Sequence, residues 1–242
     1  MKLKEIKKIG VLVMIMIAIG ALSVTQASGQ KIKGDGNVIK QERSVSGFTE
    51  IEVSGALSVT LVQTNEEGVI VEADKNLMDY IITKVSGSTL KLYTKESISN
   101  STKLHVTVKL VKLEGLEISG AVSIDNKGML NTNEFEIDCS GASKIDLEIT
   151  TQKLEGDISG GSKISLSGTA DMLSMDISGA AKVDAFDLKT NMCEFDISGA
   201  AKAEIYCSDK LEAEISGTAK IVYKGNPSVE NSISGVASIE KY

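Results

Sequence analysis

The stretch DISGAAKV at residues 176–183 returns almost unchanged as DISGAAKA at residues 196–203. A Ser-Gly pair followed by a small residue recurs in this way throughout the second half of the chain. The glycines of these pairs, which we call the structural corners, are Gly120, Gly141, Gly160, Gly179, Gly199, Gly217 and Gly235. Their spacings are 21, 19, 19, 20, 18 and 18 residues. A repeat of this length is typical of one turn of a β-solenoid.

Apolar and polar residues alternate on both sides of each corner. Met175 and Ile177 precede Gly179 by four and two positions, and Val183 follows it by four. A period of two places such residues on one face of a strand, and successive coils stack about 4.8 Å apart. The sequence therefore predicts an all-β, right-handed parallel β-helix with regular coils of ~19 residues over residues 116–242. We expect glycine at each corner because it tolerates a positive φ or an otherwise strained backbone.

Charged residues also recur at fixed distances from the corners. The acidic members, three positions before the glycine, are Asp138, Asp157, Asp176, Asp196 and Glu214. The basic members, three positions after it, are Lys144, Lys163, Lys182, Lys202 and Lys220. We interpret these columns either as a solvated salt-bridge lattice that fixes the register or as a polar strip that binds a surface polymer.

Residues 34–115 are rich in predicted strands but less regular. Ser54-Gly55-Ala56 shares the corner motif, and residues 48–62 alternate well. We interpret this half as irregular opening coils of the same solenoid, and a separate small β-domain is the alternative.

The first 29 residues read as a signal peptide. Four lysines between residues 2 and 8 precede an apolar run from Ile9 to Leu22, and small residues precede Gln30. That run is shorter than the ~20 residues that cross a bilayer. An uncleaved anchor is the alternative. Because the first cysteine is Cys139, the sequence argues against a lipid-anchored protein. Residues 30–242 then form one exported domain, which is periplasmic, outer-surface or secreted.

Charge and composition exclude several functions. The chain has 26 basic and 33 acidic residues, a net charge of −7, which argues against nucleic acid and anionic membranes as partners. Arg43 is the only arginine and His105 the only histidine, and we expect His105 to be exposed on its strand. One histidine supports neither a multi-histidine metal site nor a Ser-His-Asp triad. We predict no catalytic residue, cofactor or metal, and contact with a membrane only during export.

The chain has three cysteines, Cys139, Cys193 and Cys207, and the alternation directs all of them inward. We predict buried free thiols that act as small hydrophobic side chains. A bridge between Cys193 and Cys207 is the alternative.

Several short motifs resemble one bacterial family. They are GDGN at residues 34–37, RSVSGFTEIEV at 43–53, VEADKNL at 71–77, GSTL at 87–90 and LEGLEISG at 113–120. Their order resembles the head GIN domain family, over about residues 34–242. This chain lacks the proline that the family often has before Leu113, a difference that concerns a turn. The resemblance implies an exported β-helical protein, described as an auto-transporter adhesin, and it brings no catalytic residues.

We therefore expect a non-catalytic adhesin or structural protein that binds a surface glycan or protein ligand through its elongated face. A carbohydrate-binding or polysaccharide-cleaving β-helix is the alternative, although evenly spread carboxylates argue against a hydrolytic site. A third hypothesis is an envelope-stress accessory protein without a ligand. The open strand edge of the last coil predicts homo-oligomers.

Overall fold

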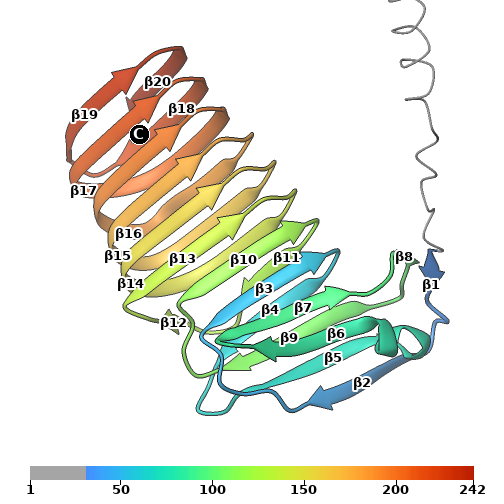
Figure 1. The fold of residues 1–242 in the computed structure, drawn as a ribbon. Helices are drawn as coiled ribbons and strands as arrows, with labels where there is room; N and C mark the ends of the chain where they lie inside the picture. The colour runs from blue at the N-terminus through green and yellow to red at the C-terminus, as the bar shows by residue number, and fades with distance from the viewer. Residues whose placement is uncertain (1–30) are drawn as a thin grey trace, which may run out of the picture. The chain divides into compact units, whose positions relative to one another are not determined.

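The second half of the chain is a parallel β-solenoid, which confirms the predicted fold class (Figure 1). The computed structural model describes residues 31–242, so the predicted signal peptide lies outside the described residues. About seven turns fill residues 115–241. Their strands are β10 (Gly115–Gly120), β11 (Ser123–Asn126), β12 (Leu130–Asn131), β13 (Glu134–Cys139), β14 (Lys144–Ile158), β15 (Lys163–Ile177), β16 (Lys182–Ile197), β17 (Ala200–Ile215), β18 (Thr218–Lys224), β19 (Ser228–Ile233) and β20 (Val236–Lys241).

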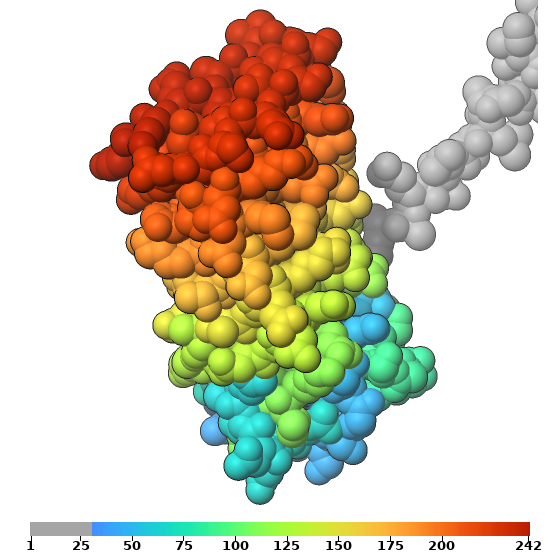
Figure 2. All heavy atoms as spheres, turned by 90° about the vertical axis from the view of Figure 1, so that its left-hand side faces the viewer, coloured from blue at the N-terminus to red at the C-terminus, as the bar shows by residue number. Residues whose placement is uncertain are grey.

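Each coil contributes to two sheets that meet at the Ser-Gly corner. The pre-corner sheet contains β10, β13, β19 and the second halves of β14 to β17. The post-corner sheet contains β11, β18, β20 and the first halves of β14 to β17. All these pairings are parallel. Equivalent residues of successive coils lie directly opposite each other, as Asp157 and Asp176 do. In Figure 2 the coils follow one another along the solenoid in chain order.

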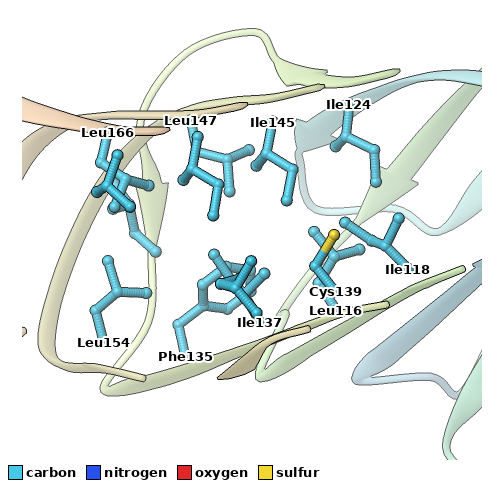
Figure 3. Packing of buried hydrophobic residues seen from close by; sticks show 14 of the residues in the cluster. Leu116, Ile118, Ile124, Phe135, Ile137, Cys139, Ile145, Leu147, Leu154 and Leu166 are labelled. Carbon is cyan, nitrogen blue, oxygen red and sulfur yellow. The ribbon is translucent and has the colours of Figure 1, made fainter. Parts of the chain in front are cut away.

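The interior is filled by the predicted apolar columns. Figure 3 shows Ile124, Ile145 and Leu147 of the post-corner sheet facing Leu116, Ile137 and Leu154 of the pre-corner sheet. All six side chains are buried. Burial of one such side chain contributes about 1.5–3 kcal/mol. Stacked layers of aliphatic side chains therefore supply most of the core of this chain, which has no tryptophan.

Most corner positions require glycine because successive coils approach each other closely there, and not because the backbone has a positive φ. Gly55 and Gly120 do have positive φ, 95° and 107°. The glycines at 141, 160, 179, 199 and 217 do not. A Cβ on Gly160 would instead lie 1.9 Å from the carbonyl oxygen of Gly141. That oxygen accepts a hydrogen bond from the Gly161 N–H at 3.0 Å, so the corners form a continuous ladder.

The N-terminal half is a mixed sheet rather than a simple series of coils. Its elements are β1 (Ile32–Lys33), β2 (Val38–Arg43), β3 (Glu50–Gly55), β4 (Ser58–Gln63), β5 (Gly68–Asp74), the 3₁₀ helix η1 (Lys75–Tyr80), β6 (Ile81–Ser86), β7 (Thr89–Thr94), β8 (Ile98–Asn100) and β9 (Leu104–Leu110). β3 and β7 extend the pre-corner sheet in parallel, and β4 and β9 extend the post-corner sheet. β6, β5 and β2 then add antiparallel pairings, which the repeat did not predict. β1 and β8 pair in parallel as a separate two-stranded sheet.

Candidate functional site

The predicted acidic residues form a continuous column on the outside of the pre-corner sheet. Each member lies directly opposite the next in the parallel register. This first carboxylate column consists of Glu52, Glu117, Asp138, Asp157, Asp176, Asp196 and Glu214. Alternation directs their side chains outward, because the intervening residues fill the core.

A second column of carboxylates runs beside the first on the same sheet. Its members stand five positions before each corner glycine and were not singled out from the sequence, although the same spacing rule identifies them. This second carboxylate column consists of Glu50, Glu136, Glu155, Glu194, Glu212 and Glu230. Gly115 and Ser174 occupy the two remaining positions. We call the two columns together the acidic face.

The acidic face contains several shallow hollows. A hollow of about 640 Å³ lies around Gly115, where the second column lacks a side chain, and Glu50, Glu117 and Glu136 line it. A hollow of about 500 Å³ lies farther along, and Asp196, Glu212 and Glu230 are among its lining residues. The face therefore offers shallow, negatively charged recesses along the solenoid axis.

The two carboxylate columns differ in their ion pairs. Lys153 lies 2.7 Å from Glu155, and Lys210 pairs with Glu212 and with Glu230, the latter at 3.3 Å. In the first column, no member from Glu117 to Glu214 has a cation of residues 31–242 within 4.0 Å. Burial and the charge of Asp157 raise the pKa of Asp138. The first column is thus a stack of like charges.

The predicted lysine column exists, but it lies on the post-corner sheet. Lys144, Lys163, Lys182, Lys202 and Lys220 stack in direct register. Three of them have carboxylate partners, which lie on the same sheet. Lys202 and Lys182 lie 2.8 and 3.6 Å from Glu204, and Lys220 lies 2.7 Å from Glu240. One of the two interpretations of these columns was a salt-bridge lattice between them; no such ion pair is found among residues 31–242, because the corner turns the two columns onto different sheets.

His105 was predicted to be exposed, but it is half-buried. Its Nδ1 lies 3.3 Å from Ser58 Oγ, and its Nε2 lies 3.4 Å from Thr107 Oγ1. Burial lowers the pKa of His105, and the charge of Lys103 adds to this effect. These two contacts hold the imidazole ring of His105 on the post-corner sheet.

All three cysteines are free and buried, as predicted. Cys139 Sγ lies 3.1 Å from Ser162 Oγ. Cys207 donates to the Lys210 carbonyl at 2.9 Å. A hydrogen bond with Cys207, together with burial, raises the pKa of Cys193 far above its usual range. Cys193 is therefore a neutral thiol.

Within residues 31–242, no three histidine, cysteine or acidic side chains converge in a way that could hold a metal ion. The described part of the chain contains no helix that is long and apolar enough to span a bilayer.

Together these features define a class of protein, a β-solenoid that displays carboxylate columns on one sheet and a lysine column on the other. A family model described as "Putative auto-transporter adhesin, head GIN domain" matches residues 47–227. This chain belongs to the head GIN domain family, as its motifs indicated.

Solved structures share the fold. A "putative adhesin" from Bacteroides fragilis NCTC 9343 is 22% identical with a TM-score of 0.83, covering 87% of this chain and 100% of that chain. A "putative adhesin" from Parabacteroides merdae ATCC 43184 is 20% identical with a TM-score of 0.68, covering 88% and 99%. A "Putative lipid binding protein" from Parabacteroides distasonis ATCC 8503 is 26% identical with a TM-score of 0.74, covering 88% and 100%. No curated protein matches the chain.

Proposed function

We propose that this protein is an exported, non-catalytic adhesin that binds its partner along the acidic face. The observation that carries this proposal is the first carboxylate column from Glu117 to Glu214, whose carboxylates stack in register over successive coils with no cation of residues 31–242 within 4.0 Å. Such a stack does not stabilise the folded state, because like charges directly opposite one another destabilise a sheet.

A cationic partner would relieve this repulsion. Basic groups on a cell-surface protein or an amino sugar match the charge of the column. The hollows around Gly115 and beside Glu212 give such groups room to approach. Association through the last coil remains a separate prediction.

The test measures attachment of protein-coated beads to bacterial and epithelial cells, together with binding to immobilised poly-lysine. One variant changes Asp138, Asp157, Asp176 and Asp196 to asparagine. The control changes Asp146, Asp171, Asp184 and Asp209 to asparagine, so it carries the same change in charge away from the acidic face. We expect the first variant to lose attachment and poly-lysine binding, and the control to keep both. Equal attachment by the two variants would overturn the proposal.

A further inference from the structure

A β-bulge interrupts the solenoid on the post-corner sheet. The register between β16 and β17 moves from Ala185 opposite Ile205 to Lys189 opposite Tyr206. Three residues, 186–188, therefore have no partner in β17. Leu188 turns inward and is fully buried, whereas Phe186 is only half-buried. Bulges of this kind redirect side chains and are common beside functional sites.

Phe186 belongs to a group of aromatic rings and lysines. Its ring meets that of Tyr242 edge-on, with centroids 5.3 Å apart and an interplanar angle of 66°. Lys224 Nζ lies 4.0 Å from the Phe186 centroid and 4.9 Å from that of Tyr242. We define the aromatic-lysine patch as Phe186, Lys189, Tyr206, Lys224 and Tyr242.

The patch follows the coil register. Lys189 pairs across the sheet with Tyr206, and Tyr206 pairs with Lys224, so three successive coils supply a Lys-Tyr-Lys row. Lys189 Nζ lies 4.0 Å above the centroid of Tyr206. Cation–π contacts of this type hold an ammonium group in place while leaving its remaining hydrogens free to donate.

Neither lysine of the patch is neutralised by a carboxylate among residues 31–242. Glu204 pairs with Lys182 and Lys202, and Glu240 pairs with Lys220, whereas the exposed Asp187 of the bulge has no lysine of residues 31–242 within 4.0 Å. Tyr242 is 79% exposed, which leaves its ring accessible. The patch thus combines the exposed ring of Tyr242 with two ammonium groups that are held over aromatic rings.

We infer that the aromatic-lysine patch binds an acidic polysaccharide. Aromatic faces accept the apolar C–H surface of a sugar ring, and ammonium groups pair with its carboxylates. An anionic membrane fits less well, because such surfaces are recognised by clusters of about four to eight basic residues. This chain presents two lysines here and carries a net charge of −7. The inference adds a second ligand to the acidic face and does not depend on it.

The test measures binding of the whole protein to polygalacturonate and hyaluronate, with neutral dextran as a reference. One variant carries Lys189→Gln and Lys224→Gln, and another carries Tyr242→Ser. The matched control carries Lys144→Gln and Lys163→Gln, which removes two lysines of the same sheet that make no cation–π contact with an aromatic ring of residues 31–242. Circular dichroism melting verifies that every variant is folded.

We expect each patch variant to weaken uronate binding about tenfold or more, and the control to retain it. The acidic-face variant should also retain it, which separates failure of this inference from failure of the proposed adhesive function. Equal losses in the patch and control lysine variants would overturn the inference, as would uronate binding no stronger than dextran binding. Binding to phosphatidylserine vesicles without uronate binding would assign the patch to lipid instead.

Discussion

The carboxylate of Asp157 lies directly opposite Asp138 in the parallel register of two successive coils. Neither has a cation of residues 31–242 within 4.0 Å, although Lys153 and Glu155 form an ion pair on the same strand as Asp157. Burial and the neighbouring charge both raise the pKa of Asp138. This pair is the repeating unit of the acidic face, and it links the architecture of the solenoid to its proposed binding role.

Asp138→Asn should stabilise the protein at neutral pH. Like charges directly opposite in a sheet cost roughly 0.2–1 kcal/mol, and the substitution removes one of them. The pKa of Asp138 is raised in the folded state, so the repulsion lowers the stability of the wild type when Asp138 is ionised. This loss of stability disappears as the carboxyl is protonated at low pH. The stability gain over the wild type should therefore shrink as the pH falls, as measured by urea unfolding. Glu96→Gln, an exposed carboxylate outside both columns, serves as the control; a gain for Asp138→Asn that does not depend on pH would contradict the explanation.

Gly160→Ala should destabilise the solenoid by about 2–3 kcal/mol, the upper range for overpacking. The new Cβ would lie 1.9 Å from the Gly141 carbonyl oxygen, so two coils must move apart. The adjacent Gly161→Ala is the control, since its Cβ would lie 3.9 Å from the nearest atom and other coils have alanine at this position. We expect Gly161→Ala to be neutral or slightly stabilising. Similar urea midpoints for the two variants would show that the corners are not closely packed.

Asp74→Asn should loosen the N-terminal half and alter its acid stability. The fully buried Asp74 carboxylate accepts hydrogen bonds from the backbone N–H groups of Gly36 at 2.6 Å and Thr102 at 2.7 Å. Burial alone would raise the pKa of Asp74, but these hydrogen bonds dominate and lower it. A lowered pKa contributes stability that is present above the unfolded-state value and is lost as the pH falls through the folded-state value.

Hydrogen exchange measures this effect directly. The Gly36 and Thr102 amides should lose protection in Asp74→Asn, and the acid side of the stability profile should flatten. Asp35→Asn, an exposed neighbour, should leave the Thr102 amide protected. Unchanged exchange in Asp74→Asn would show that Asp74 does not hold these segments together.

The three buried cysteines should react with a thiol reagent only when the protein unfolds. All three thiols are buried, so a reagent cannot reach them in the folded protein. Cys193 is in addition a neutral thiol, and thiolates rather than thiols are the reactive species. A hydrogen bond with Cys193 lowers the pKa of Cys207, so the protection of Cys207 depends on its burial. We expect negligible labelling of the native protein and labelling of all three thiols in guanidinium chloride. A mass two daltons lower before reduction would instead reveal a Cys193–Cys207 bridge.

Much of the solenoid could be predicted because its periodicity is local. Ile177 and Met175 alternate with polar residues, and the corner glycine marks where the alternation restarts, so the columns follow from counting. The same count would have revealed Glu136 and Glu194 of the second carboxylate column. The antiparallel strands β2, β5 and β6 carry no repeat, so their pairing had no signal of this kind.

By itself the sequence determined the parallel stacking, the register of the coils and the identity of the charged columns, because a parallel repeat places equal positions of successive coils opposite each other. Only the tertiary structure decided that Asp157 and Lys163 lie on different sheets, that Gly160 is required by the approach of Gly141, and that Phe186, Lys224 and Tyr242 meet. These features depend on how far apart the coils lie, where each corner turns the chain, and where a bulge shifts it. Such distances join residues that are remote in the chain, so local alternation does not encode them.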